Sequence, residues 1–520
     1  MTLPATASPP ASLGSLVKAA NVVFAVMVFS AAMGFVREML VAYAFGTSLQ
    51  SDAFFFASEL ALSIPDVLTG GMVGALIPLY AQFKREGNIC VIDFTSTVVN
   101  FYLVLLVVAM VAVALVAPLA SAWLAPGFDQ AGQALMTHVL WMLAPLVVLA
   151  GLWQIFKAFL EAERRFLASQ FSTVFLALGV IGAILVLRPW LGIYCLPVGL
   201  VVGGLVQVVW AAFWLRRQGF VYCPTVWAVN GRQFRRFLRL LVPGIVGGLI
   251  GGVIPVIDKS MASALSEGSV ASLSFAGRPV AMATRFGLFS LITALLPTLA
   301  WNALEYDRPT FRLAVSRLLG LMIFLSAPLA MVLSALRVPI IQVLFEHGAF
   351  DAQATAATSE LFGVLILGMI PLTIASVLAT IFKSIQDPRT PALLGGGSNL
   401  VSKVVLNLTL IGPLGVGGIA LATALQHVVS GMLLLFLLRR RLGGIGGWHL
   451  AQTLGKVALA SLGAYLAVVL MGKQLLLPPL LHCVGGLVLG AAVYGSISLG
   501  LRTRELTLAT DFLLRRRTAA

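Results

Sequence analysis

Long apolar segments recur along the whole chain, and they constrain its fold more than any other feature. A membrane-spanning helix needs roughly 20 mostly apolar residues. The sequence predicts about 14 such helices, at residues 18–44, 52–82, 93–124, 135–160, 166–188, 193–215, 237–264, 270–300, 312–336, 357–383, 390–411, 415–438, 449–472 and 478–501. Only 10% of the 520 residues are charged, against roughly 25% in a soluble domain. The predicted fold class is an all-α integral membrane protein.

Basic residues are concentrated in every second connection between these segments. If the N-terminus is cytoplasmic, the inner connections hold most of them, including Lys84, Arg85, Arg164, Arg165, Arg216, Arg217, Arg235, Arg236 and Arg439 to Arg441. The outer connections hold only Arg188, Arg337 and Lys473. Because cytoplasmic loops carry the excess of Lys and Arg, both termini are expected in the cytoplasm. We assign the net charge of +15 to these loops, not to nucleic-acid binding.

Two short matches between the halves of the chain indicate an internal repeat. Ala75–Pro78 resembles Ala294–Pro297, and Ile155-Phe156-Lys157 resembles Ile381-Phe382-Lys383, at similar offsets. The matches pair helices two and four with helices eight and ten, which predicts a parallel repeat of two six-helix bundles, a common transporter plan. The expected divisions are a disordered tail at 1–17, lobes at 18–217 and 232–441, two extra helices at 448–501 and a basic tail at 502–520.

Ionisable side chains lie inside several predicted spans, where each costs a few kcal/mol on insertion scales and calls for an explanation. They concentrate in helices one, two, seven and eight, which predicts a polar cavity between the two bundles. The set is Arg37, Glu38, Asp52, Glu59, Asp66, Asp258, Lys259, Arg278, Arg285, Glu360, Lys403 and His427.

Three of these residues are candidates for binding an anion. The guanidinium groups of Arg37, Arg278 and Arg285 suit phosphate, because they are always charged and bind two oxygens at once. Asp52 and Glu59 complete the candidate substrate-binding set. In the alternative interpretation the acids and bases pair with each other and hold helices together. Asp52 and Glu360 lie near the outer face, where we expect simple solvation.

A second candidate group lies on helices seven and eleven. Asn399 and Lys403 are four residues apart and share a helical face, and Asp258 could reach them. One interpretation is a buried Asp–Lys pair with an amide hydrogen bond. The other is an ion-coupling site at which a cation or proton competes for Asp258.

Motifs of enzymes are missing from the sequence. It has no phosphate-cradling GxxxxGK[ST] segment and no Cys/His spacing typical of a zinc site. We therefore predict a transporter, not an enzyme, without a metal or another cofactor. An ion gradient, the membrane potential or the substrate supply would drive it.

The first two predicted helices resemble those of the MurJ (MviN) family, lipid II flippases of the multidrug/oligosaccharidyl-lipid/polysaccharide exporter superfamily. The similar stretches are Gly34-Phe35-Val36-Arg37-Glu38, Ala44-Phe45-Gly46, Ser51-Asp52-Ala53-Phe54-Phe55 and Ile64-Pro65-Asp66, followed by Ala276-Gly277-Arg278 and Gly348-Ala349-Phe350. The resemblance covers nearly the whole chain. It implies two lobes that open alternately to each side of the membrane, and a groove for the polyprenyl tail at the two extra helices.

The chain departs from the family pattern at charged positions. The family usually has a further arginine before the Gly-Phe motif and paired arginines after the Ile-Pro motif, whereas no Lys or Arg lies between Arg37 and Lys84. Some members have a sodium site joining helices seven, eleven and twelve. Asp258 and Asn399 resemble its ligands, but Lys403 stands where an acid is expected. Our hypothesis is that the Lys403 ammonium replaces the ion.

The leading functional hypothesis is a flippase that moves a polyprenyl-diphosphate-linked saccharide across the bacterial cytoplasmic membrane, with Arg37 and Arg278 gripping the diphosphate. The glycan would be that of lipid II or of a related cell-envelope or exopolysaccharide intermediate. The expected partners are this glycan lipid, membrane lipid and the machinery of envelope synthesis. The alternatives are a cation-coupled exporter of small amphiphiles and a membrane scaffold without transport.

Overall fold

The computed structural model describes residues 13–503 and Glu505, apart from positions 87, 228, 230, 286–307, 388, 445–446, 476 and 504. Regular structure in these residues is helical throughout, and this confirms the predicted all-α class. Some predictions lie outside the described residues: most of the N-terminal tail, the end of the eighth span with its Ala294–Pro297 match, and most of the C-terminal tail.

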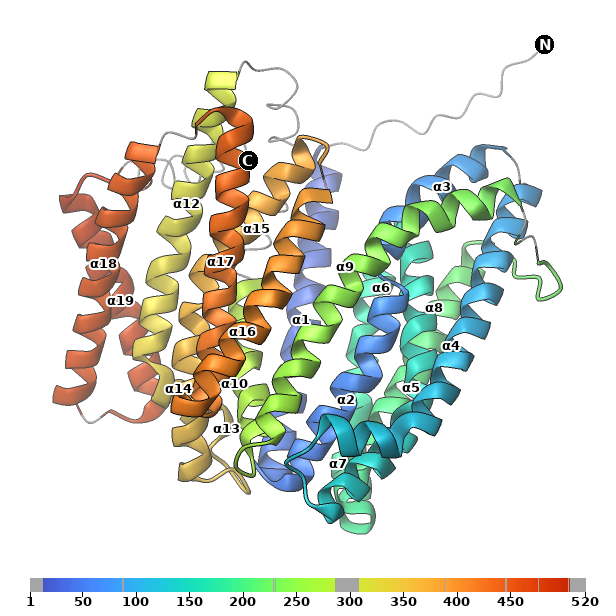
Figure 1. Ribbon diagram of the computed structural model, residues 1–520, viewed down its shortest axis with the longest axis horizontal. Coiled ribbons are helices and arrows are strands. Elements are labelled where there is room, and N and C mark those ends of the chain that lie inside the picture. Colours follow the sequence, from blue (N-terminus) through green and yellow to red (C-terminus); the bar gives the residue numbers. More distant parts are fainter. Residues whose placement is uncertain are drawn as a thin grey trace. The chain divides into compact units, whose positions relative to one another are not determined.

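The helices keep the labels of Figure 1. They are α1 (Leu13–Phe45), α2 (Leu49–Leu68), α3 (Met72–Glu86), α4 (Asn88–Leu124), α5 (Gln130–Ala162), α6 (Phe166–Phe171), α7 (Thr173–Leu191), η1 (Gly192–Tyr194), α8 (Cys195–Arg217), α9 (Arg232–Ser263), α10 (Ser269–Thr284), α12 (Arg308–Ala335), α13 (Arg337–Phe345), α14 (Ala352–Leu367), α15 (Met369–Ser384), η3 (Pro391–Gly395), α16 (Gly396–Leu414), α17 (Val416–Leu442), α18 (Gly447–Gln474) and α19 (Pro479–Gly500).

Twelve segments of the described chain are long and apolar enough to cross a membrane. One of them, Phe166–Arg217, is 52 residues long and holds two predicted spans. It turns back at η1, and α7 then packs against α8. A further predicted span, 270–300, runs beyond the described residues. With these two additions the twelve segments correspond to the fourteen predicted spans.

Several predicted spans are broken helices. The span at 52–82 consists of α2, a turn at Thr69–Gly71 and α3. The turn contains Gly71 at φ 76°, a left-handed conformation that side chains other than glycine rarely adopt. The span at 390–411 begins with the π-helical turn η3. The glycine-rich α9, by contrast, is helical throughout.

The described helices form two compact units. The first unit comprises the chain up to Leu40 together with Ile64–Leu115 and Trp141–Gly244. In it α7 and α8 approach closely at small residues, because a Cβ at Gly179 would lie 2.4 Å from the carbonyl oxygen of Gly199. A cluster of aromatic rings joins the start of α9 to α3 and α4, and its members are Phe83, Phe94, Phe101, Phe234 and Phe237.

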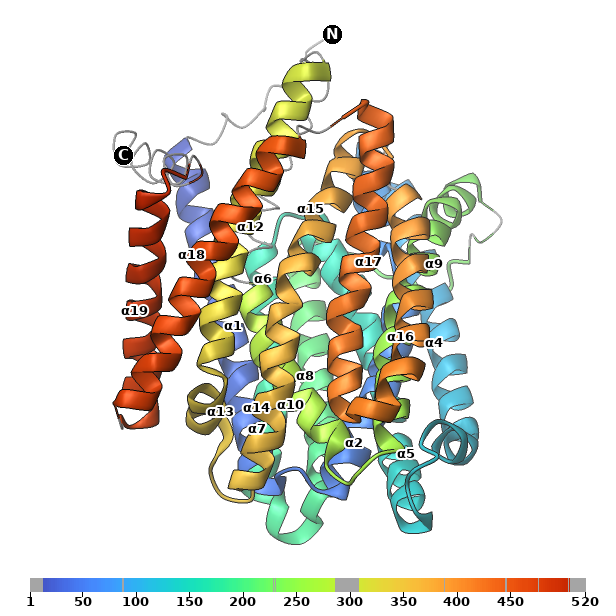
Figure 2. The same cartoon turned by 60° about the vertical axis from the view of Figure 1, so that its left-hand side comes forward.

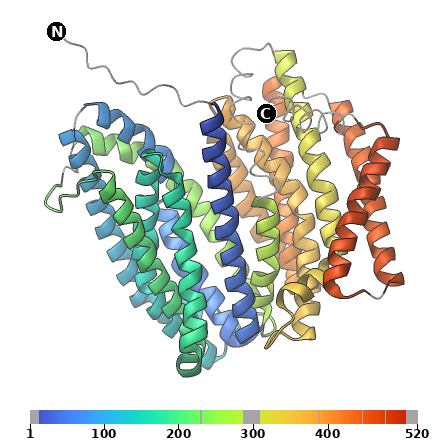
Figure 3. The same ribbon diagram turned by 180° about the vertical axis from the view of Figure 1, so that it is seen from behind.

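The second unit comprises Val41–Ser63, Val116–Leu140 and the chain from Ile245 onwards. One apolar core lies among α12, α15 and α17. A second core joins α12 to α18 and α19. The hairpin of α18 and α19 packs on α12 and α13, and Figures 1, 2 and 3 show the two red helices side by side from three directions. The predicted lobes at 18–217 and 232–441 are a different division of the chain and stay a prediction.

Candidate functional site

Two adjacent residues of α9 carry opposite charges and have different partners. Lys259 donates from Nζ to Glu59 Oε2 of α2 at 2.8 Å, and also to the Phe55 carbonyl oxygen at 2.8 Å. Asp258 accepts from Lys403 Nζ of α16 at 3.0 Å. Because successive residues of a helix point in directions about 100° apart, one turn of α9 serves both contacts. All of these residues belong to the second unit.

The first group, called here the Lys259 cluster, consists of Glu59, Lys259 and Arg278. The Lys259 side chain is 9% exposed and that of Glu59 is 31% exposed. Arg278 of α10 has an exposed side chain, and its charge acts on the Glu59 carboxylate. Arg278 thus presents an exposed guanidinium beside the Glu59–Lys259 pair. Such a group attracts an anion.

Arg285 lies two turns after Arg278 on the same chain segment and is also exposed. At seven residues' separation, the two positions lie on similar faces of a helix. The structure thus brings Glu59 and Arg278 together with Lys259, which was counted among the intramembrane charges but not among the binding candidates, and it places Arg285 further along.

The second group, called here the Lys403 cluster, surrounds an ammonium that is fully buried. Lys403 Nζ donates to Asp258, to the Ile419 carbonyl oxygen at 3.2 Å and to the Thr423 hydroxyl of α17. Asn407 Nδ2 donates to the same Asp258 oxygen at 3.0 Å. One acid and two neutral oxygens thus satisfy the three ammonium donors, which is the condition for burying a charge at tolerable cost.

The amide that contacts Asp258 differs from the expected one. Asn407 makes the contact, whereas Asn399 lies on the other side of Lys403, and its buried Oδ1 has no hydrogen-bond partner within the described residues. Asn399, Lys403 and Asn407 follow one another at intervals of four residues and share one helical face. The interval in the sequence could have indicated Asn407 equally well.

Arg37 lies in the first unit, on α1. Its guanidinium pairs with the neighbouring Glu38 carboxylate at 2.5 Å, and Glu38 is buried. The expected alternative, in which Arg37 pairs with a nearby acid, is therefore present. Its part in substrate binding stays a prediction.

Asp52 occupies a different environment from the one expected. Its side chain is buried, and it accepts hydrogen bonds from the backbone N–H groups of Gly268 at 2.7 Å and Ala271 at 2.6 Å. It therefore caps the N-terminus of α10, where a negative charge is favourable. The solvation expected for Asp52 is wrong. Glu360, by contrast, is exposed as expected.

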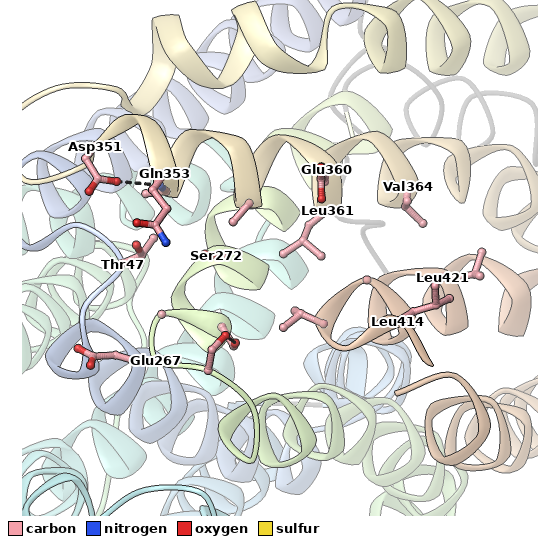
Figure 4. A pocket seen from close by; sticks show the side chains of 17 residues that line it. Thr47, Glu267, Ser272, Asp351, Gln353, Glu360, Leu361, Val364, Leu414 and Leu421 are labelled. Atoms are coloured by element: carbon pink, nitrogen blue, oxygen red, sulfur yellow. Dashed lines mark hydrogen bonds between the residues drawn. The ribbon is translucent and has the colours of Figure 1, made fainter. Parts of the chain in front are cut away.

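A cavity of about 890 Å³ lies beside this cap, between the start of α10, the start of α14 and the α16–α17 turn. Figure 4 shows Glu267 across the cavity from Asp351 and Glu360. Glu267 accepts from the Leu49 N–H at 2.8 Å, so α2 and α10 each receive an acid at their N-terminus from the other's segment. The acids make this cavity unsuited to a diphosphate, unlike the Lys259 cluster.

Comparisons with known proteins agree on one family. Residues 41–480 match the family described as lipid II flippase MurJ. The lipid II flippase MurJ of Burkholderia cenocepacia is 26% identical over 430 residues, which cover 78% of this chain and 81% of that protein. The probable lipid II flippase MurJ of Synechocystis is 28% identical over 494 residues and covers 88% of both chains.

Solved structures show the same fold. A lipid II flippase MurJ in an inward closed conformation superimposes with a TM-score of 0.79 at 22% identity, covering 92% of this chain and 98% of that one. An inward-facing multidrug transporter of the MATE family gives a TM-score of 0.66 at 13% identity, covering 82% of this chain and 98% of that one. Because the family match spans most of the sequence, this chain belongs to the MurJ lipid II flippase family.

Proposed function

We propose that this protein is a flippase that carries a polyprenyl-diphosphate-linked saccharide from the inner to the outer leaflet of the bacterial cytoplasmic membrane by alternating access. The family match over residues 41–480 is the main support. Since the relatives are named as lipid II flippases, lipid II is the first substrate to test. A related cell-envelope or exopolysaccharide intermediate is the second.

The Lys259 cluster supports a diphosphate ligand. Arg278 presents an exposed guanidinium there, beside the ion pair of Lys259 and Glu59. A guanidinium binds two phosphate oxygens at once, and such charge-assisted bonds are strong. Arg278 is thus our proposed diphosphate ligand, with Lys259 and Glu59 holding the local charge in place. Arg285 is a proposed second contact.

Arg37 is proposed as a further contact for the head group. Its pair with Glu38 has to be shared or released when phosphate binds. Arg37 also lies just outside the residues that match the family, whereas Arg278 lies inside them. We therefore expect Arg278 to matter more than Arg37.

Transport measured in proteoliposomes tests these roles. The purified protein would be reconstituted with lipid II, and head groups reaching the far leaflet would be counted by an enzyme that acts only there. Arg278→Ala should lose nearly all transport, and Arg278→Lys should keep part of it because the charge stays. Arg440→Ala is the matched control, since Arg440 is an exposed arginine whose guanidinium lies 4.5 Å from the Phe436 ring centre. Full transport activity in Arg278→Ala would exclude the proposed binding of the diphosphate by Arg278.

Lys403 is proposed to act as a built-in cation. Its ammonium already occupies a set of oxygen ligands from Asp258, Ile419 and Thr423. Transport by the natural protein should then be independent of sodium. Lys403→Asp should create sodium dependence, and unchanged behaviour of that variant in sodium and in potassium buffer would count against the idea.

The alternative of a cation-coupled exporter of small amphiphiles rests on fold alone. The MATE transporter shares the architecture at 13% identity. The exposed Arg278 guanidinium of the Lys259 cluster disfavours a cationic substrate there. Binding of a polyprenyl-linked glycan, set against binding of a lipophilic cation, separates the two functions.

The family and the twelve apolar segments support a multi-pass inner-membrane protein. We further propose that both termini are cytoplasmic, as the distribution of basic residues indicates. Cysteines introduced at Arg440 and Lys473 should then react with an impermeant reagent from opposite sides of the membrane.

A further inference from the structure

A second cavity, of about 620 Å³, lies in the first unit and takes no part in the proposed transport mechanism. Apolar side chains of α4, α5 and α8 form its walls, and the segment after α8 forms its remaining side. The lining includes Leu103, Phe156, Ala212, Leu215, Arg216 and Tyr222. Its volume falls in the range of roughly 300–1,000 Å³ that is typical of ligand pockets.

The segment after α8 is held in a fixed conformation. Gly219 N–H donates to the Arg216 carbonyl, and Phe220 N–H donates to the Leu215 carbonyl. This pattern is a Schellman helix end, and Gly219 adopts the required left-handed conformation at φ 77°. The Phe220 ring then packs on Phe159 of α5, with ring centres 5.1 Å apart.

Side chains of α4 hold the next residues of this segment. Tyr222 donates from its hydroxyl to Asn100 Oδ1 at 2.6 Å, and Asn100 Nδ2 donates to the Pro224 and Val226 carbonyl oxygens at 3.0 Å each. Ser96 Oγ accepts from the Cys223 N–H at 3.0 Å. Hydrogen bonds and ring packing thus hold the segment that forms one side of the cavity.

Two neighbouring arginines at the end of α8 differ in their surroundings. Arg216 lines the cavity, is exposed and has no ion-pair partner within the described chain. Arg217 lies outside the lining, and its guanidinium lies 4.6 Å from the Phe213 ring centre and 6.0 Å from that of Trp214. Glu161 and Glu163 of this unit pair with lysines. Arg216 thus places one uncompensated positive charge at the rim of an apolar cavity.

We propose that this cavity is a binding site for an anionic phospholipid, separate from the transported substrate. The parts of the acyl chains next to the head group lie against Leu103, Phe156 and Ala212, and the phosphate binds Arg216. Acyl chains are the abundant apolar material around a membrane protein, and basic pockets between membrane helices bind anionic head groups. Arg216 can bind two phosphate oxygens at once, while Tyr222 marks the polar end of the site.

Lipid retention on the purified full-length protein tests this site. The protein would be exchanged into detergent with either dioleoylphosphatidylglycerol or dioleoylphosphatidylcholine, and bound lipid would be counted by native mass spectrometry. Phosphatidylglycerol should be retained more strongly. Arg216→Gln should lower its affinity roughly fivefold, the equivalent of about 1 kcal/mol for one basic residue near a lipid surface. The matched Arg217→Gln should change it less than Arg216→Gln.

A second variant tests the cavity itself. Ala212→Phe fills the space beside Arg216 and should lower retention of phosphatidylglycerol while keeping the charge. Thermal unfolding checks that the variant is folded, and Ala212→Met replaces it if it is not. Equal losses in Arg216→Gln and Arg217→Gln would indicate only diffuse attraction to the surface and would overturn the proposal. So would equal retention of the two lipids, or unchanged retention in the filled cavity.

Discussion

Lys259 and Lys403 are both intramembrane lysines of the second unit, and their surroundings differ in how far they are closed to solvent. Each ammonium donates to one carboxylate and one backbone carbonyl. Lys403 adds the Thr423 hydroxyl and is fully buried, so its donors are all satisfied within the protein. The carboxylate partner of Lys259 is Glu59, which is partly exposed and lies near a second cation.

The comparison shows how one helix turn can serve both structure and binding. Asp258 and Lys259 are consecutive, yet Asp258 contributes to a closed cluster and Lys259 to an open one whose carboxylate is partly exposed. A closed cluster holds helices together, because any foreign ligand must displace a protein group. An open cluster can accept a ligand, because its exposed guanidinium can be reached by an anion.

The largest expected effect is that of removing Lys403. Lys403→Met leaves the Asp258 carboxylate buried without a cation, which should cost about 3–5 kcal/mol of unfolding free energy. The double variant Asp258→Asn with Lys403→Met removes both charges and should recover most of that loss. Thermal unfolding in detergent measures both. If the double variant is no more stable than the single one, the pair is not what holds this part of the unit together.

A smaller effect is expected at Lys259. Lys259→Met leaves Glu59 partly solvated and close to Arg278, so the loss should be about 1–2 kcal/mol, between values for exposed and buried pairs. Lys259→Arg should restore most of the stability, since it restores the charge. A loss as large as that of Lys403→Met would show that the Lys259 cluster is as closed as the other one.

The next effect concerns the two acids at helix N-termini. Asp52→Asn leaves one accepting oxygen for two backbone N–H groups and removes a buried charge from the start of α10, and should cost about 1 kcal/mol. Asp351, which accepts from the Ala354 N–H at 2.7 Å at the start of α14, is exposed and serves as the control. Asp351→Asn should cost less. Chemical unfolding measures the free energy of unfolding of both variants. If Asp351→Asn loses as much stability as Asp52→Asn or more, burial of the capping residue is unimportant.

The smallest effect is at Asp387, which lies between α15 and η3, outside the membrane-spanning segments. The Thr390 hydroxyl donates to Asp387 at 2.7 Å and lowers its pKa below the usual value, and the Arg441 guanidinium acts in the same direction. A lowered pKa gives stability that is present above the unfolded-state pKa and is lost as pH falls through the folded-state pKa.

Replacing Asp387 with Asn should therefore reduce stability at neutral pH by about 0.5 kcal/mol, as for other exposed pairs. The difference between natural protein and variant should shrink below pH of about 4, where a free carboxyl is protonated. Unfolding midpoints measured from neutral to acidic pH test this. A difference that stays constant over that range would contradict the role of the charge.

The residue types of the candidate site could be predicted from the sequence. Which side chains contact one another was predicted less well. Lys403 and Asp258 were expected to meet, and they do. We expected Asn399 at Asp258, but Asn407 makes the contact, because both amides lie on the Lys403 face of α16 and only the level of Asp258 on α9 selects one of them. Asp52 was expected in solvent because the sequence places it near a helix end. The sequence does not show that the N-terminus of α10, from a distant segment, lies against that position.

By itself, the sequence determined the helical membrane class, the number of apolar segments and the family, since these follow from hydrophobicity, length and local motifs along the chain. Tertiary structure alone decided which of the intramembrane charges are closed off and which remain available. Helical spacing specifies the face on which a side chain lies, but pairing depends on the level at which another helix crosses. For this reason the sequence does not distinguish Lys259 from Lys403, since both are lysines within predicted spans. Only their partners in the folded protein show which one lies at a binding position and which one is structural.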